Sequence, residues 1–354
     1  MLPVPSFDTL DDYVARKLVS RVDLDNLSIY NYTEATTYTH AWDDVTRVCR
    51  GLILNRETGE VVARAFDKFF NHGERGVDQQ IPDTLPDAVT IKHDGSLGIG
   101  FRHRGRFLWS TRGSFYSLQA AIAQRIWDDR YTHVDVPYNL TPLVEIIAPG
   151  TRNVVNYGDR EDLILLAVRD RFTGEDLPFD RVQALGALWS MSVTRQVGGD
   201  LASIIAQAAT LDHQHEGFVV RWGDFRLKVK SLEYMAVARL IMGLSPRRIA
   251  DIWYAKRLDL LEPLPEEHRD YALDQMLVLD RKVDTARAEL AAMIESVGAG
   301  HDRKSFVAAV GTSHPMFKMA IDHFTGREVD YAAHVYRVEF DGRPRPVDVE
   351  VSDA

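Results

Sequence analysis

The sequence predicts an α+β protein in two parts: a mixed, largely antiparallel-sheet domain over residues 1–240 and an all-helical domain over 241–354. Two observations predict this division. Short apolar runs of strand length, separated by turn-forming residues, recur as far as Lys230, whereas helical periodicity dominates after it. In addition, a chain of 354 residues exceeds what one hydrophobic core usually organises.

The elements before residue 90 are a mixture of helix and strand. Apolar residues spaced for one face predict a helix over 7–20. A stretch rich in tyrosine and threonine predicts an extended segment over 27–38. Strands are expected at 48–54 and 61–66, joined as a hairpin, and the polar residues 78–87 with their prolines form a connection.

The centre of the first domain is the stretch Ile91-Lys92-His93-Asp94-Gly95. Apolar residues lead into it, an alternating apolar run leaves it, and Asp-Gly is a turn dipeptide. The pattern therefore predicts a strand, a tight turn and a second strand that form a hairpin. Lys92 would be the last strand residue before the turn, with small residues beside it that leave room for a ligand.

The rest of the first domain is also predicted to be a mixture of strands and helices, whereas the second domain is predicted to contain helices alone. Up to Lys230 we expect strands at 107–111, 143–148 and 163–168, helices over 115–128 and from about 180 and 199, and a hairpin of 216–222 with 225–230. Beyond it, helical periodicity covers 232–243, 247–258, 266–297, 303–310 and 327–337.

Composition limits the classes of protein that need be considered. The formal net charge of −10 argues against an indiscriminate nucleic-acid coat, although it allows a local basic groove. One cysteine, Cys49, excludes an intrachain disulfide framework. The sequence has no apolar stretch near the ~18 residues that span a bilayer and no signal-peptide layout at its start, so we expect no membrane partner and a cytoplasmic location.

Five short motifs occur in a fixed order along the first domain. They are Arg50-Gly51, Lys68-Phe69-Phe70-Asn71, Lys92-His93-Asp94-Gly95, Glu216-Gly217-Phe218-Val219 and Lys228-Val229-Lys230. The last three resemble the covalent nucleotidyltransferases, which include DNA and RNA ligases and mRNA capping enzymes. The first two narrow the resemblance to ATP-dependent RNA ligases of the phage T4 RNA ligase 1 type, over roughly residues 30–235.

This resemblance implies an adenylation domain over 1–240 and a three-step reaction. Lys92 would be the nucleophile that takes AMP from ATP as a covalent lysyl-AMP intermediate. AMP would then pass to an RNA 5′-phosphate, and an RNA 3′-hydroxyl would displace it to join the ends. Forming a covalent intermediate splits one difficult displacement into easier ones. The expected biology is RNA repair, with cleaved tRNA as one substrate.

The resemblance also assigns roles to basic residues. Lys228 and Lys230 would contact the α-phosphate, and strand alternation places both on one face. We expect these cations and a bound metal to disfavour the charged form of Lys92. Arg50 and Lys68 would bind the β- and γ-phosphates. The other nucleotide contacts implied are Tyr32, Asp94, Gly95 and Glu145.

Two carboxylates complete the expected site. Glu216 would be a ligand of Mg²⁺ or Mn²⁺, and Glu145 would contact the ribose or the metal, because Mg²⁺ prefers oxygen ligands. Alternatively, Glu145 is a structural residue paired with an arginine such as Arg152. The family often stacks adenine on an aromatic residue of the strand after Glu145, but residues 163–168 are aliphatic.

Other functions remain open at this point. A DNA ligase or capping-type nucleotidyltransferase shares the Lys92 motif, and a non-catalytic nucleotide- or RNA-binding protein would share the fold. For an RNA ligase, the partner is RNA with 5′-phosphate and 3′-hydroxyl ends; whether a kinase or phosphatase heals those ends stays open. The helical domain, where Arg247, Arg248, Lys256 and Arg257 are clustered, would select the RNA. We expect a monomer.

Overall fold

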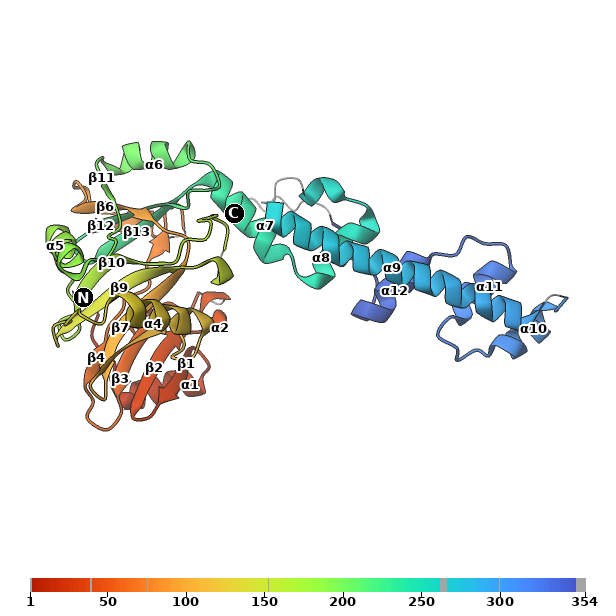
Figure 1. Cartoon of the computed structure of the whole chain (residues 1–354), viewed down its shortest axis with the longest axis horizontal. Helices are drawn as coiled ribbons and strands as arrows, with labels where there is room; N and C mark the ends of the chain where they lie inside the picture. Colours follow the sequence, from red (N-terminus) through yellow and green to blue (C-terminus); the bar gives the residue numbers. More distant parts are fainter. Residues whose placement is uncertain are drawn as a thin grey trace. The chain divides into compact units, whose positions relative to one another are not determined.

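The chain folds into two compact units, Met1–Ala236 and Val237–Ala354. A computed structural model describes residues 2–38, 40–74, 76–151, 153–261, 266–298 and 300–347 (Figure 1). The division lies inside one helix, α7 (Leu232–Gly243), whereas the sequence analysis placed the boundary at residue 240.

Among the described residues, the strands of the first unit form three sheets. One contains, in spatial order, β1 (Val19–Leu24), β2 (Leu27–Tyr32), β3 (Arg50–Asn55) and β4 (Val61–Ala63). The second contains β10 (Asp162–Asp170), β9 (Leu140–Ile147), β7 (Ser96–His103) and β8 (Arg106–Thr111). The third contains β11 (Gln196–Val197), β6 (Ala88–Lys92), β12 (Gly217–Trp222), β13 (Phe225–Lys230) and β5 (Phe70–Asn71). Every pairing is antiparallel except that of β13 with β5, which confirms the predicted fold class.

The predicted hairpin at Asp94-Gly95 is wrong. β6 pairs with β11 and β12 in the third sheet, whereas β7 pairs with β8 and β9 in the second. The turn at residues 93–95 therefore carries the chain from one sheet to the other. An Asp-Gly dipeptide favours a turn locally, but which strands pair depends on segments far away in the sequence.

The third sheet has one apolar face and one charged face. Phe218, Val220 and Trp222 of β12 pack with Leu227 and Val229 of β13 against α6 (Leu201–Ala209). The alternate residues, among them Arg226, Lys228 and Lys230 of β13, line a cavity on the opposite face. The period of two in this hairpin therefore separates a core face from a ligand face.

Helices cover the second sheet and begin the chain. α4 (Leu118–Arg130) and α5 (Phe179–Trp189) contribute Trp127 and Trp189 to a core shared with Trp109 of β8. The predicted helix over 7–20 ends early: α1 (Phe7–Ala15) is capped by Ser6 and followed by β1. The segment expected to be extended over 27–38 becomes helical at α2 (Glu34–Tyr38), and α3 (Asp44–Val48) precedes β3. Two 3₁₀ turns, Asp78–Gln80 and Pro149–Thr151, lie in connections.

The second unit is helical throughout its described part, as its periodicity predicts. Its elements are α8 (Pro246–Ala255), a 3₁₀ turn (Leu258–Leu261), α9 (Glu266–Val297), α10 (Arg303–Val310), α11 (Phe317–Phe324) and α12 (Tyr331–Phe340). Among the α-helices described in this unit, α11 alone was not expected. Leu290, Phe306 and Tyr336 are central to its core. Within the described ranges no helix combines the length and apolarity that crossing a membrane requires.

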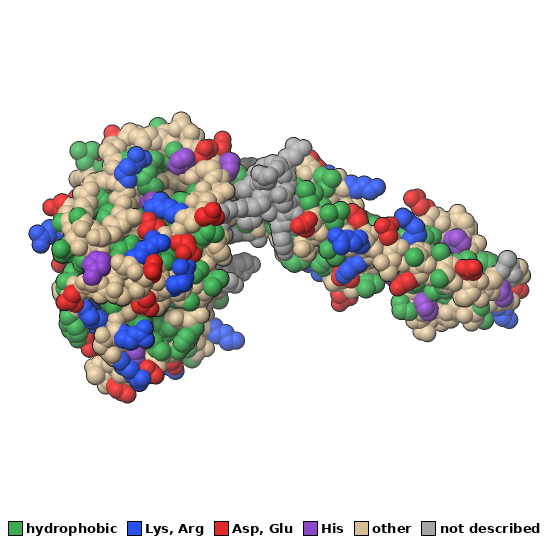
Figure 2. All heavy atoms as spheres, viewed as in Figure 1, with side chains coloured by type: hydrophobic (Ala, Val, Ile, Leu, Met, Phe, Trp, Pro, Cys, Tyr) green, Lys and Arg blue, Asp and Glu red, His purple; other side chains and the backbone are tan. Residues whose placement is uncertain are grey.

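Charges are mixed on the surface. On the face shown in Figure 2, Lys and Arg side chains lie interspersed with Asp and Glu on both units. Arg247 donates to the carbonyl of Phe340, Arg248 donates to the carbonyl of Pro346 and Arg257 pairs with Asp259, so three of the four basic residues singled out on the second unit already have partners within it. Figure 2 thus agrees with the acidic net charge in giving no extended basic surface on this face.

Candidate active site

A cavity of about 530 Å³ lies between the second and third sheets of the first unit. This volume is in the range of pockets that hold nucleotide-sized ligands. Its charged lining residues are Arg50, Lys92, Arg112, Glu145, Arg221, Arg226, Lys228 and Lys230. Cations therefore outnumber carboxylates around the cavity, which favours an anionic ligand.

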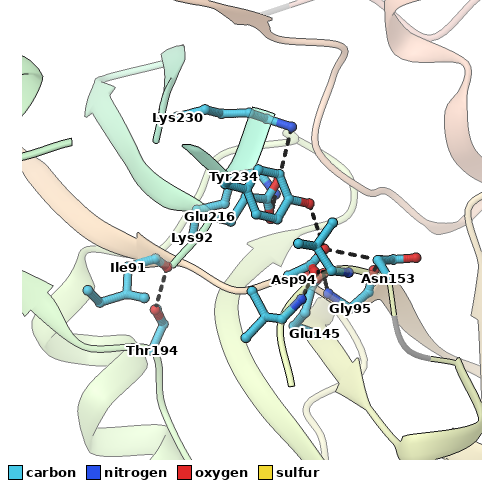
Figure 3. Close-up of polar contacts among 12 residues, drawn as sticks. Ile91, Lys92, Asp94, Gly95, Glu145, Asn153, Thr194, Glu216, Lys230 and Tyr234 are labelled. Carbon is cyan, nitrogen blue, oxygen red and sulfur yellow. Dashed lines mark hydrogen bonds and ion pairs between the residues drawn. The ribbon is translucent and has the colours of Figure 1, made fainter. Parts of the chain in front are cut away.

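Lys92 ends β6 at the point where the chain leaves the third sheet. Gly217 lies opposite Lys92 on one side and opposite Lys230 on the other, so the two lysines flank a residue without a side chain. Both reach Glu216: Lys92 Nζ lies 2.7 Å from Oε2 and Lys230 Nζ lies 2.9 Å from Oε1 (Figure 3). The motifs at 92, 216 and 228–230 thus meet in space.

The charge state of Lys92 differs from the expectation. Burial acts to lower the pKa of this lysine, but the carboxylates of Glu216 and Glu145 outweigh it, so the pKa is raised. The expectation rested on the cations near Lys92, whereas the carboxylate of Glu216, hydrogen-bonded to this lysine, acts in the opposite direction. In this state Lys92 is an ammonium held by Glu216, and its proton must leave before it can act as a nucleophile.

Lys228 is the cation of the site with the most perturbed environment. It lines the same cavity as Lys230, as the alternation of β13 predicts. Burial, reinforced by Arg50 and Lys68, lowers the pKa of Lys228 well below its ordinary value. Its Nζ lies 4.8 Å from the ring centre of Phe69. Binding of phosphate would relieve the repulsion among these cations.

Glu145 enters from β9 in the second sheet. Its Oε1 accepts a hydrogen bond of 3.0 Å from the backbone N–H of Gly95. Burial, opposed by Lys92, raises the pKa of Glu145 to about 7. Arg152, the alternative partner, lies outside the described residues. Glu145 therefore lines the cavity and is hydrogen-bonded to the turn that follows Lys92.

Asp94 fixes this turn. Its Oδ2 accepts from the backbone N–H groups of Val154 and Val155, each at 2.8 Å, and Oδ1 accepts from Tyr234 at 2.8 Å and Asn153 at 3.2 Å (Figure 3). The buried carboxylate is thus engaged by protein donors, and Asp94 is not among the residues that line the large cavity. Gly95 does line it, and a Cβ there would lie 2.4 Å from the carbonyl oxygen of Ile146.

A second group of cations lies near β3. Arg50 lines the cavity, lies 5.4 Å from the Phe69 ring and has a buried Nη1 that finds no hydrogen-bond partner among the residues that the structure describes. Arg112 donates to the Tyr32 hydroxyl at 2.5 Å. Burial lowers the pKa of Lys68, and the nearby positive charges of Arg50 and Arg112 lower it further. Arg50 and Lys68, which come from two of the motifs, and Tyr32, a contact implied by the resemblance, are therefore near one another.

The carboxylates present suit a divalent cation shared with a ligand. Within the described part of the chain, no group of three or more Asp, Glu, His or Cys side chains is arranged to hold a metal ion. Two carboxylates, Glu145 and Glu216, act on the same lysine. Mg²⁺ commonly binds through one or two carboxylates together with phosphates and water, so this donor set fits a metal that arrives with a nucleotide.

Sequence reasoning missed several residues of the site. Tyr234, in the first turn of α7, donates a hydrogen bond to Asp94, and Thr194 donates one to the carbonyl of Ile91 at 3.0 Å (Figure 3). Residues 163–168 are aliphatic as predicted; the aromatic side chains of the cavity come from Phe66, Phe69 and Phe179. Their contacts join distant segments, and of these residues only Phe69 lies within one of the five motifs, Lys68-Phe69-Phe70-Asn71.

Comparison with known proteins agrees with this geometry. The chain is 26% identical over 231 residues to a protein of Autographa californica nuclear polyhedrosis virus provisionally named a bifunctional polynucleotide kinase/RNA ligase (55% of this chain, 32% of the relative). It is 30% identical over 169 residues to a Thermovibrio ammonificans protein provisionally named an RNA ligase (46% of this chain, 43% of the relative). The chain thus spans well under half the length of these relatives.

A solved archaeal ATP-dependent RNA ligase is similar with a TM-score of 0.48 and 14% identity, over 80% of each chain. The family model described as RNA ligase matches residues 48–234, slightly more than half of the 354 residues. This span contains all five motifs, from Arg50-Gly51 to Lys228-Val229-Lys230, and it includes every lysine that lines the cavity. The chain belongs to the RNA ligase family of the T4 RNA ligase 1 type.

Proposed function

We propose that this protein is an ATP-dependent RNA ligase that joins RNA 5′-phosphate and 3′-hydroxyl ends through lysyl-AMP. The observation that carries the proposal is the position of Lys92. It lines a cavity of about 530 Å³, beside Lys230 and Glu216, and its charge lies close enough to Lys228 to help lower the pKa of that lysine. A nucleophile and a phosphate-binding group are therefore combined in one site.

In the first step, Lys92 gives up a proton from its ammonium and attacks the α-phosphorus of ATP. A P–N bond forms, a second proton leaves the nitrogen, and the bond to the bridging oxygen breaks, so pyrophosphate departs with the electron pair. Lys228 and Lys230 would stabilise charge on the α-phosphate, while Arg50, Lys68 and Tyr32 would orient the departing phosphates. Gly95 would let the nucleotide approach the turn that Asp94 holds.

In the second step, an oxygen of the RNA 5′-phosphate attacks the same phosphorus, the P–N bond breaks, and the nitrogen of Lys92 takes up a proton and leaves as the amine. In the third, the RNA 3′-hydroxyl loses its proton and attacks the RNA phosphorus, and AMP leaves. Glu216 and Glu145 would hold Mg²⁺ or Mn²⁺, which when bound neutralises phosphate oxygens as a Lewis acid. Glu145 would otherwise bind the ribose hydroxyls.

Transfer of label tests the first step. ATP labelled at the α-phosphate, with magnesium or manganese, should label the wild-type protein, and the label should survive denaturation. Lys92→Ala should abolish labelling, because it removes the nitrogen to which AMP would be bonded. Lys304→Ala, which removes an exposed lysine of α10, is the matched control and should label normally. A wild-type protein that forms no adduct would contradict the proposal.

The proposed substrate is RNA with cleaved tRNA among the candidates, and the helical unit would select it. The viral relative's name joins a kinase to a ligase, which supports an end-healing partner for this chain as well. A ligation screen across tRNA halves, linear single strands and nicked duplexes, each with defined ends, tests the substrate class. A preference for nicked DNA over every RNA would instead favour a DNA ligase.

A further inference from the structure

The ammonium group of Lys68 is surrounded by three aromatic rings. Its Nζ lies 4.8 Å from the ring centre of Phe70, 4.9 Å from Trp42 and 5.9 Å from Tyr32. The rings also pack on one another edge to face, Tyr32 on Trp42 at 4.9 Å and Trp42 on Phe70 at 5.7 Å. We call Tyr32, Trp42 and Phe70 the aromatic box. Their faces attract a cation through the negative potential of the rings.

The aromatic box holds a charge that no acid neutralises directly. Among the described residues, no carboxylate is within ion-pair distance of Lys68 Nζ. Glu74 acts on Lys68 from further away, and its Oε2 already accepts from the backbone and side-chain amides of Asn71 at 2.9 and 3.2 Å. Burial lowers the pKa of Lys68, and Arg50 and Arg112 reinforce this effect.

This arrangement differs in its consequence from an ion pair. A carboxylate would hold Lys68 in place but would also cancel its charge and compete with any anion that approaches. Aromatic rings hold the ammonium and leave its charge available. Two further cations next to the box are similarly available: Arg112 lies 4.8 Å from the Tyr32 ring, and the Nη1 of Arg50 has no hydrogen-bond partner within the described part of the chain. The group therefore suits a polyanion such as pyrophosphate.

The backbone fixes the wall of the box to which Trp42 belongs. Asp43, the next residue, caps α3 through a reciprocal pair of hydrogen bonds with Thr46. At the other end of this helix, the carbonyl of Arg47 accepts from the backbone N–H of Lys68 at 2.7 Å. α3 thus connects the indole to the backbone of the lysine that it contacts, so Trp42 has the geometry to determine where the ammonium lies.

We propose that Trp42 is a positioning residue that holds Lys68 charged and in place for the terminal phosphates of the nucleotide. The inference rests on the proposed function for the identity of the anion. Trp42 acts through Lys68 and touches no reacting atom. Its effect should therefore be confined to states of the reaction in which a pyrophosphate group is present.

Three substitutions test this. Trp42→Ala should raise the ATP concentration that gives half-maximal lysyl-AMP formation by about tenfold, since one desolvated cation–π contact is lost. Trp42→Phe should restore most of the wild-type value. Trp42→Leu fills the space without an aromatic face and should behave like alanine. Sealing of pre-adenylated RNA without ATP should be unchanged in all three, because that step releases AMP and involves no pyrophosphate.

The outcomes separate positioning from packing. If leucine restores ATP use as well as phenylalanine, or if sealing of pre-adenylated RNA falls in parallel, the proposal is overturned. Phe172→Ala is the matched control: it removes a ring 4.6 Å from the Arg171 guanidinium, and Phe172 does not line the cavity. This variant should leave ATP use unchanged; an equal rise in it would also overturn the proposal.

A binding measurement keeps the inference independent of catalysis. Calorimetric titration of inorganic pyrophosphate into the full-length protein should give weaker binding for Trp42→Ala than for wild type, and equal binding would overturn the proposal. If the wild-type protein formed no lysyl-AMP, the proposed function would fail, yet this titration would still decide whether Trp42 prepares Lys68 for a polyphosphate.

Discussion

At the scale of single residues, Glu216 determines the charge at the end of the cavity. One carboxylate oxygen contacts the proposed nucleophile and the other contacts Lys230. Because Glu216 is 4% exposed, water screens these contacts little. The resting protein therefore keeps Lys92 as a paired ammonium, and ligand binding must redistribute this charge before chemistry begins.

Asp94→Asn should destabilise the first unit. The carboxylate accepts hydrogen bonds from two backbone amides and from the side chains of Asn153 and Tyr234. The side-chain amide of asparagine has an NH₂ group in place of one carboxylate oxygen, so it could not accept all of these hydrogen bonds. We expect a loss of about 2 kcal/mol or more in the free energy of unfolding, measured by urea denaturation. Asp159→Asn, at an exposed site nearby, should change stability by less than about 0.5 kcal/mol. Equal effects of the two substitutions would contradict this account of the turn.

The thiol of Cys49 should be unreactive in the folded protein. Burial, with a smaller contribution from Asp43, raises its pKa to about 12. The unfolded thiol has a pKa of about 8.5. At a pH between these two values, the thiol therefore stays protonated in the folded state and loses its proton in the unfolded state. Stability from this group is present below pH 8.5 and falls as the pH rises toward 12. A thiol reagent at pH 8 should react slowly with native protein and rapidly in urea; rapid reaction without urea would count against this prediction.

The site residues that could be predicted from the sequence are those that belong to short motifs with a known chemical role. Lys92, Glu216 and Lys230 were predicted from short patterns, and the structure brings them together. Trp42 and Tyr234 were not, because each acts through a contact with a residue of another segment. The raised pKa of Lys92 was missed for the same reason: it depends on carboxylates, Glu216 first and then Glu145, whose distances no local pattern specifies.

At the scale of elements, the β12–β13 hairpin depends on Gly217. Its φ is +133°, and a Cβ would lie 2.1 Å from the carbonyl oxygen of Val229. Gly217→Ala should therefore separate the strands next to Glu216 and Lys230, lowering stability by about 3 kcal/mol. Lysyl-AMP formation should fall with it, as measured by labelling.

Gly150→Ala is the control for this substitution. A Cβ at that position meets no atom within 4 Å, and its φ is not in the left-handed region. Stability and labelling should match the wild type. If Gly217→Ala were equally harmless, the close approach of the two strands could not be a requirement of the site.

Strands and helices with a strong period were predictable, and their partners were not. The 216–230 hairpin and the long helix α9 follow from alternation and helical spacing alone. The transit from β6 to β7 looked like a hairpin because its turn residues favour one. The N-terminal helix was predicted too long because apolar residues of β1 continued its pattern, although Lys17, with φ of 60°, lies outside the helix.

At the scale of the whole molecule, the two units should be separable in function. Every residue that lines the large cavity belongs to the unit Met1–Ala236. A chain that ends after Gly243 keeps α7 complete, and with it Tyr234. We expect this shortened chain to form lysyl-AMP at the wild-type rate and to seal structured RNA less well than the full chain. Loss of labelling would show that the cavity needs the helical unit.

The turn at residues 93–95 links the layer that holds Lys92 to the layer that holds Glu145. An AMP group bonded to the first layer and resting against the second would cross-link the two. The adenylated protein should then resist heat better than the free protein, and transfer of AMP to RNA would return the layers to their looser state. The adenylated state would in this way differ from the free protein in rigidity as well as in chemistry.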